Sequence, residues 1–325
     1  MSSRPWRVVA IAAAVTAAAF QFVGTAAATG PLPLKYQTAK APVENAPTVY
    51  AVFWGPQWQL GWSDVSTNSG TSYSSAQAEA YITGFFQYLG STSTKWNSSQ
   101  KQYCSGVPVG TVNCGGSGKH VASTAVAFGG AWVDTTSPPP PPVVPDDCAY
   151  AVCVSGGAVD QANLLAQEAI RAEAHFLGPK GYKQGANFIV FLPKATATPG
   201  YGLYCAYHAD VIDNNGHDLT FTNMPYVMDM NQNCGTNFVN SDNAFGNGWF
   251  DGYSIVAGHE FAEAETDPFP GTSPAWLDAN GNETGDKCAW INPGTPGGAY
   301  NIGPDKAGHH YAVQSLWSNT AMGCV

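Results

Sequence analysis

Residues Thr48–Trp54 form an almost wholly apolar run that is rich in β-branched and aromatic side chains. The run follows Pro47 and has the length of a strand, so it predicts a β-strand that is buried on both faces. Strands of this kind are typical of parallel or mixed sheets whose two faces are covered by helices.

The pattern of helices around this strand places the chain in the α/β class. Ser74 and Gln77 form a capping box in front of residues 78–89, whose apolar side chains recur with a helical period. A second amphipathic helix is expected from about Asp160, with one stripe made by Leu165, Ala169, Ala172 and Phe176. Further strands are expected at 121–128, 188–192, 226–230 and 311–317. We therefore predict a single α/β domain over residues 47–325, on the border with α+β, with helices packed on a mixed sheet.

The N-terminal 46 residues divide into two parts. Residues 1–28 have the pattern of a signal peptide, with Arg4 and Arg7, an apolar run and a small-residue cleavage site at 26–28. Residues 29–46 are interpreted as a lead-in, and the sequence leaves open whether they are an activation segment. A proline-rich stretch near 137–145 is expected to be a surface loop within the domain.

Cysteine content and charge both favour an exported protein. The eight cysteines are even in number and lie after the signal-like segment, which predicts four disulfides. Their spacing suggests two local pairs, Cys104 with Cys114 and Cys148 with Cys153. Only 11% of residues are charged, with 13 Lys and Arg against 23 Asp and Glu, so we expect no nucleic-acid partner. No later apolar run is long enough to span a membrane, and secretion is the predicted localisation.

The residues most suggestive of chemistry lie in an acidic segment with a helical pattern. Asp251 is expected to cap this helix, and Pro268 should end it near Thr266. His259 and Glu263 are four residues apart, so they project from one face of the helix as two ligands of one metal must. Glu260 then corresponds to the general base of the zinc peptidases, with Glu replacing the second His of the HExxH motif. The segment thus predicts a zincin-like active-site helix.

A third ligand is expected in residues 276–288. The Asn280–Gly281 dipeptide predicts a hairpin that returns the chain toward the helix, and a bridged Cys288 would fix Asp286 there. We therefore expect Asp286 as the third ligand, with His208 as the second choice and His309 or His310 as the third.

The metal is expected to be Zn²⁺, with Ca²⁺ as the alternative. The alternative rests on oxygen ligands spaced at loop positions 1, 3, 5 and 9, which are Asp278, Asn280, Asn282 and Asp286. However, position 6 is Glu283 instead of Gly and position 12 is Ala289, so the segment is not an EF-hand.

Several motifs together resemble the secreted phosphate-induced, exordium-like proteins of plants and, more closely, their bacterial relatives. These motifs are Tyr50–Gly55, Phe85–Leu89, Cys205–His208, His259–Glu263 with Thr266–Pro268, Gly285–Cys288 and Gln314–Asn319. The resemblance implies export and a shared fold. It also implies a functional group made by His208, His259, Glu263 and Asp286, although Asp267 stands where the plant motif has Asn.

Two functions follow as expectations. The first is a secreted metal-dependent peptidase that acts on an extracellular polypeptide. The alternative is a non-catalytic extracellular protein of the exordium type, whose acidic cluster binds calcium or whose surface binds cell-wall material.

Overall fold

The computed structural model describes residues 32–91, 95–121, 126–139, 157–196 and 204–325. Its centre is a five-stranded sheet in which four neighbouring strands are parallel and one edge strand is antiparallel. In spatial order the strands are β7 (Ala127–Asp134), β2 (Thr48–Trp54), β8 (Ala186–Phe191), β10 (Asp218–Met224) and β9 (Tyr207–Ile212). The predicted α/β class with a mixed sheet is confirmed.

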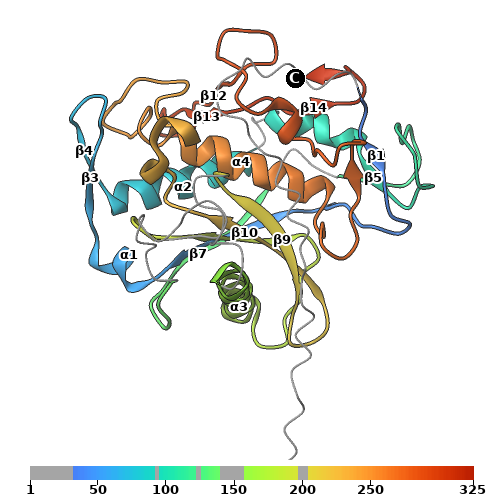
Figure 1. Ribbon diagram of the computed structural model, residues 1–325, viewed down its shortest axis with the longest axis horizontal. Helices are drawn as coiled ribbons and strands as arrows, with labels where there is room; N and C mark the ends of the chain where they lie inside the picture. The colour runs from blue at the N-terminus through green and yellow to red at the C-terminus, as the bar shows by residue number, and fades with distance from the viewer. Residues whose placement is uncertain (1–31, 92–94, 122–125, 140–156, 197–203) are drawn as a thin grey trace, which may run out of the picture.

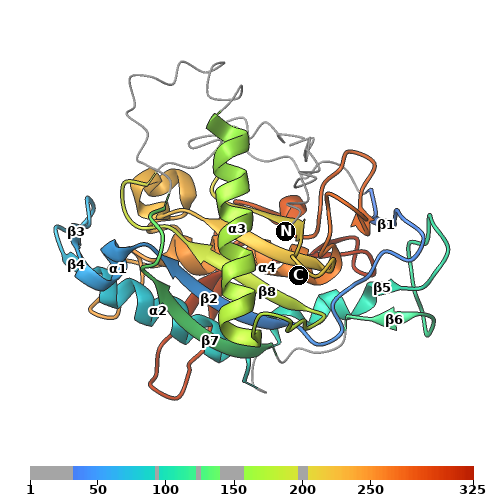
Figure 2. The same ribbon diagram turned by 90° about the horizontal axis from the view of Figure 1, so that it is seen from below.

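Helices cover both faces of this sheet. The odd-numbered residues of β2 from Val49 to Phe53 pack with α2 (Ser75–Leu89) and α4 (Asp251–Thr266). The even-numbered residues of the same strand pack with α3 (Gly157–Leu177). Figure 1 shows α3 on one side of the sheet and α2 with α4 on the other, and Figure 2 shows α3 running across the strands. Because successive side chains of a strand point to opposite faces, an all-apolar β2 requires this three-layer arrangement.

The two predicted helices form where the sequence signals lie. The Ser74 hydroxyl accepts from the Gln77 backbone N–H, and Gln77 Oε1 accepts from the Ser74 backbone N–H, which completes the capping box of α2. On α3, Leu165, Ala169 and Ala172 are fully buried against the sheet. Both helices are confirmed.

Three of the predicted strands differ from the structure. Residues 226–230 are not a strand, because Val227–Cys234 form the 3-10 helix η3. The spacing of apolar residues alone cannot distinguish a short buried strand from a short buried helix. Here Val227 and Met228 pack into the core around α4. Of the strand expected at 121–128, Ala127 and Phe128 begin β7, Val121 and Val126 lie outside it, and residues 122–125 are not among the described residues. The strand expected at 311–317 is two pieces, β13 (Tyr311–Val313) and β14 (Trp317–Ser318), because Gln314 turns toward α4.

Short elements complete the described chain. They are β1 (Lys35–Tyr36), α1 (Pro56–Leu60), β3 (Ser63–Val65), β4 (Ser72–Ser74), η1 (Trp96–Gln102), β5 (Cys104–Ser105), β6 (Lys119–His120), β11 (Trp276–Leu277), η4 (Asp286–Cys288), β12 (Tyr300–Ile302) and β15 (Gly323–Cys324). Among them, β1 pairs with β11, so the beginning of the described chain lies beside the segment that leads to η4.

Disulfides fasten the loops around these elements. The predicted Cys104–Cys114 bridge is confirmed, and Cys205–Cys234 and Cys288–Cys324 are also bridged. Cys104, Cys114 and Cys288 belong to a separate small core that also contains four buried residues of the lead-in, Leu34, Tyr36, Ala41 and Val43. The proposed Cys148–Cys153 pair, residues 1–28 and most of the proline-rich stretch lie outside the described residues.

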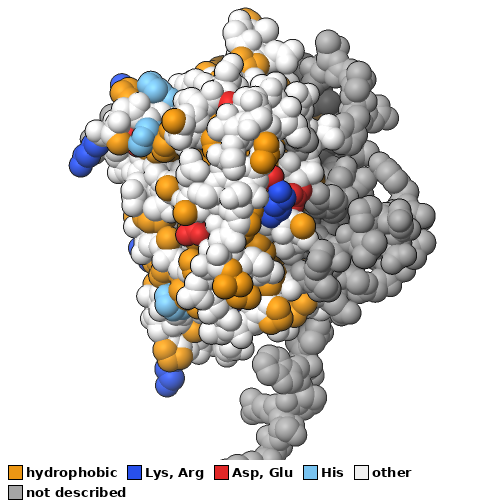
Figure 3. Space-filling model, turned by 90° about the vertical axis from the view of Figure 1, so that its left-hand side faces the viewer, with side chains coloured by type: hydrophobic (Ala, Val, Ile, Leu, Met, Phe, Trp, Pro, Cys, Tyr) orange, Lys and Arg blue, Asp and Glu red, His pale blue; other side chains and the backbone are white. Residues whose placement is uncertain are grey.

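Charged side chains are sparse on the surface, as the composition predicts. On the face in Figure 3 they are few and lie among uncharged and hydrophobic side chains. Within the described ranges, none of the helices combines the length and apolar composition that a membrane crossing requires.

Candidate metal centre

Helix α4 lies in the middle of the molecule, and its carboxylate side chains are buried in the protein interior. Every residue of Asp251–Thr266 is buried except His259, whose side chain is 13% exposed. The helix ends at Thr266, as Pro268 predicts. Asp251 is not the N-cap, because Phe250 occupies that position. Instead, the Asp251 carboxylate accepts from the backbone N–H groups of Gly248, Val239 and Asn240 and so holds the preceding loop.

His259 and Glu263 meet on one side of α4, as their spacing predicts. His259 Nε2 lies 3.0 Å from Glu263 Oε1 and 3.6 Å from Asp286 Oδ1. In a tetrahedral zinc site with bonds of about 2.1 Å, two ligand atoms are about 3.4 Å apart. Each of these two carboxylate oxygens therefore lies at a distance from His259 Nε2 that a shared small cation allows.

A glutamine side chain fixes which ring nitrogen of His259 faces these carboxylates. Gln314 Nε2 donates to the Gly285 carbonyl at 2.8 Å, which sets the orientation of its amide group. Gln314 Oε1 consequently accepts from His259 Nδ1 at 3.1 Å. Nδ1 then carries a proton, and Nε2 is the nitrogen that faces Glu263, where it can bind either a cation or a second proton. Metal-binding histidines usually donate their second ring N–H to an oxygen acceptor in this way.

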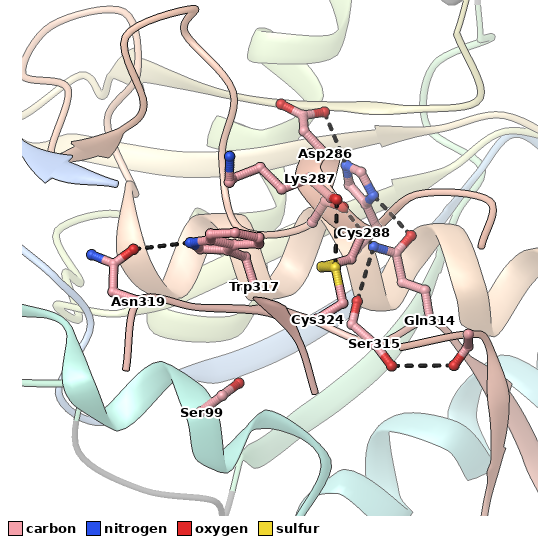
Figure 4. Close-up of a disulfide and its surroundings, with 12 residues drawn as sticks. Ser99, Asp286, Lys287, Cys288, Gln314, Ser315, Trp317, Asn319 and Cys324 are labelled. Carbon is pink, nitrogen blue, oxygen red and sulfur yellow. Dashed lines mark hydrogen bonds and ion pairs between the residues drawn. A yellow bond between two sulfur atoms is a disulfide. The ribbon is translucent and has the colours of Figure 1, made fainter. Parts of the chain in front are cut away.

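Asp286 is brought to the helix by a short loop that a disulfide closes. Its backbone N–H donates to Glu263 Oε1 at 3.0 Å, and Cys288, two residues later, is bridged to Cys324. Figure 4 shows Asp286 and Cys288 on one turn, with Gln314 beside them. The expected hairpin at Asn280–Gly281 is instead a turn, because β11 pairs with β1 and not with the chain that follows. The turn still returns the chain to α4.

Asp278, the first position of the calcium-loop pattern, has partners within the protein. The Asp278 carboxylate accepts from the backbone N–H groups of Asn280 and Asn282 and pairs with Lys287 Nζ at 2.9 Å. Lys287 is buried with its ammonium 4.2 Å from the centre of the Trp317 ring. The Lys287 ammonium therefore neutralises the Asp278 carboxylate.

His208 of β9 approaches the same carboxylates from the sheet. Its Nδ1 lies 3.4 Å from Glu260 Oε2 and 3.7 Å from Glu263 Oε2, and its Nε2 lies 3.7 Å from Glu283 Oε1. Sequence reasoning did not select Glu283 as a ligand. The only signal for it was its place among the acidic residues after β11.

Among the residues that the structure describes, two groups of three side chains have ligand atoms that all lie within 4.8 Å of one another. One group is His259, Glu260 and Glu263, and the other is His208, Glu263 and Glu283. Asp286, the third ligand expected from the sequence, belongs to neither group, and nor do His309 and His310. His309 pairs with Asp305 at 3.3 Å and stacks on Phe245, and the His310 carbonyl accepts from Asn247.

The centre is strongly negative and therefore attracts cations or protons. Burial raises the pKa of Glu263 to about 7, and the neighbouring Asp286 adds to this effect. Burial also raises the pKa of Glu283 well above its usual value. For both histidines burial lowers the pKa, but nearby carboxylates outweigh it, chiefly Glu283 for His208 and Glu263 for His259, so both pKa values lie well above normal.

Gly285 packs directly against the side chains of His259 and Glu263, and this contact leads to a prediction. A Cβ added there would lie 2.9 Å from both Glu263 Oε1 and the His259 ring. We expect Gly285→Ala to push the two side chains apart and to weaken zinc binding by about 10- to 100-fold, the range seen when supporting groups around a metal are disturbed. Gly116→Ala is the matched control, because a Cβ at Gly116 meets nothing within 4 Å. Equal zinc affinities in a competition titration would contradict the expected steric effect.

Comparisons of the chain with protein-family models, with curated proteins and with solved structures find no match.

Proposed function

We propose that this protein is a metal-dependent hydrolase, most specifically a zinc peptidase. His259, Glu263 and Asp286 hold the cation in this proposal, and Glu260 is the general base. The observation that carries it is the orientation of His259, whose Nδ1–H is held by Gln314 while Nε2 faces Glu263 at 3.0 Å. An imidazole lone pair directed at carboxylate oxygens is unfavourable unless a cation or a proton lies between them.

The chain's own groups fit a hydrolytic step. A bound Zn²⁺ supplies Lewis acidity toward a water and a carbonyl oxygen. Glu260 lies on α4 one residue after His259, with an oxygen within 4.8 Å of the His259 and Glu263 ligand atoms. From there it accepts one proton as the water oxygen bonds to the peptide carbonyl carbon, and it passes that proton to the leaving amine as the C–N bond breaks. His259 and Asp286, with side chains 13% and 22% exposed, are the ligands that a substrate could reach.

An extracellular polypeptide is the substrate class that we propose. Three disulfides are typical of proteins that fold in an oxidising compartment. Export also agrees with the signal-like pattern of residues 1–28 and with the resemblance to exordium-like proteins, which remains a prediction.

A second candidate is a non-catalytic extracellular protein in which the same cluster is structural. It is supported by the hydrogen bond from the Asp286 backbone N–H to Glu263, which ties the loop to α4, and by side-chain exposures of only 3% and 4% for His208 and Glu263. A cation or protons would then fasten the two segments, and cell-wall material would be the partner.

Chelation with reconstitution separates the two candidates. We expect the purified protein to contain zinc and to cleave an unfolded polypeptide such as reduced, alkylated albumin. Removal of zinc by 1,10-phenanthroline should abolish cleavage, and one to two equivalents of Zn²⁺ should restore it. Zinc that stabilises the protein without any cleavage supports the structural candidate. Protein that binds no zinc contradicts the peptidase proposal, and it contradicts the structural candidate in the form in which zinc holds the cluster.

A further inference from the structure

Glu263 directs its two carboxylate oxygens toward two different histidines. Oε1 lies 3.0 Å from His259 Nε2, and Oε2 lies 3.7 Å from His208 Nδ1. The two histidines come from different elements, α4 and β9, and they fall in different ligand groups that share only Glu263. A carboxylate in this position is arranged as a bridge between two cation sites.

His208 is oriented as His259 is. Its Nε2 lies 3.1 Å from the Asp267 carbonyl oxygen, which can only accept, so Nε2 carries the proton. Nδ1 then faces Glu260 and Glu263 at 3.4 and 3.7 Å, where it can bind either a cation or a second proton. The His208 side chain is 3% exposed, so no bulk water separates these groups. The same outer hydrogen bond and inner carboxylates therefore occur twice in one cluster.

Glu283 completes the second group. Its Oε1 is buried, has no hydrogen-bond partner among the described residues, and lies 3.7 Å from His208 Nε2, the ring nitrogen that also contacts the Asp267 carbonyl. A buried carboxylate oxygen without a partner is costly, so a ligand or a proton is expected at this atom.

The charge of the whole cluster also exceeds what one cation compensates. Five carboxyl groups surround the two imidazoles, namely Glu260, Glu263, Asp267, Glu283 and Asp286. Metal binding displaces protons from ligands; with all five carboxylates ionised and both imidazoles neutral, one divalent ion would leave three negative charges in the buried site, and two ions would leave one. Uncompensated buried charge is strongly unfavourable.

We propose that the centre binds two divalent cations, with the second held by His208, Glu263 and Glu283 and with Glu263 as the bridging ligand. This inference extends the proposed hydrolase function and rests on its first site. Zn²⁺ is the expected ion at both positions, because imidazole and carboxylate ligands suit it. Two-metal hydrolytic sites have ions about 3.5–4 Å apart that stabilise both the attacking and the leaving atoms.

Zinc stoichiometry tests this assignment. Apoprotein is reconstituted with excess Zn²⁺, freed of unbound metal and analysed by mass spectrometry of the element. We expect two equivalents in the wild type, one in His208→Gln and one in Glu283→Gln. His217→Gln is the matched control, because His217 pairs with Asp213 outside the cluster, and it should retain two.

The outcomes distinguish this inference from the proposed function. One equivalent in the wild type overturns the second site and leaves the first, whereas no zinc overturns both. Two equivalents that persist in folded His208→Gln place the second ion elsewhere and overturn the assignment. Should the variants fail to fold, zinc-edge X-ray absorption of the wild type still decides, since a zinc–zinc vector of about 3.5–4 Å is expected and its absence contradicts the paired site.

Discussion

Replacement of Glu260 by Gln is expected to lower kcat for peptide cleavage by about 10³-fold while the protein keeps its zinc. Removal of a general base typically costs 10²- to 10⁴-fold. Gln has nearly the same shape as Glu but cannot accept the proton that the attacking water must lose. The ligands His259, Glu263 and Asp286 are unchanged in this variant, so the measurement combines steady-state kinetics with zinc content.

Glu265→Gln on the same helix is the matched control. Glu265 is fully buried, and its carboxylate accepts from Asn97 Nδ2 at 2.9 Å. Burial raises its pKa well above the usual value, which favours the neutral carboxylic acid, so the isosteric Gln should replace it with little effect. We expect kcat within about twofold of wild type for an isosteric change outside the site. A Glu260→Gln enzyme with more than a tenth of wild-type activity would show that another group accepts the proton.

Tyr36→Ala is expected to reduce the free energy of unfolding by about 3–5 kcal/mol, the usual cost of truncating a buried aromatic residue. Tyr36 is fully buried, packs 5.8 Å from Trp276 between ring centres, and donates its hydroxyl to the Ala41 carbonyl. A loss of this size is a large part of a typical stability of about 5–15 kcal/mol. Urea denaturation followed by tryptophan fluorescence measures it.

The same variant tests whether residues 32–46 belong to the folded domain or act as a removable activation segment. Leu34 exchanges hydrogen bonds with the Asn319 side chain, and β1 pairs with β11 just before the turn that leads to Glu283. We therefore expect truncation up to Pro47 to prevent folding instead of activating the protein. Lys35→Ala is the control, because Lys35 is exposed on the same strand, and it should change stability by less than about 0.5 kcal/mol. A Tyr36→Ala change below 1 kcal/mol would indicate a loosely attached segment.

Sequence patterns predicted those parts of the fold that depend on local order. The all-apolar β2, the capping box of α2 and the buried stripe of α3 each carry their signal within fewer than about 20 residues. The run at 226–230 has no such signal, since a short apolar segment fits a strand or a 3-10 helix equally well, and tertiary packing selected η3.

The candidate site also has one part that local sequence patterns predict and another that depends on tertiary structure. The spacing of His259 and Glu263 follows from the helix itself. The contribution of Glu283 instead depends on β1–β11 pairing, on the turn at Asp278–Asn282 and on the Cys288–Cys324 bridge, none of which the local sequence specifies. Likewise, the spacing of Asp278, Asn280 and Asn282 suited calcium, but only the fold shows that Lys287 pairs with Asp278.

The most direct measurement is a crystal structure of zinc-treated protein with diffraction data collected on both sides of the zinc absorption edge. We expect an anomalous peak about 2.1 Å from both His259 Nε2 and Glu263 Oε1, with Asp286 as the third protein ligand. Density that shows the imidazole and the carboxylate joined by a hydrogen bond, with no anomalous peak near either side chain, would contradict it.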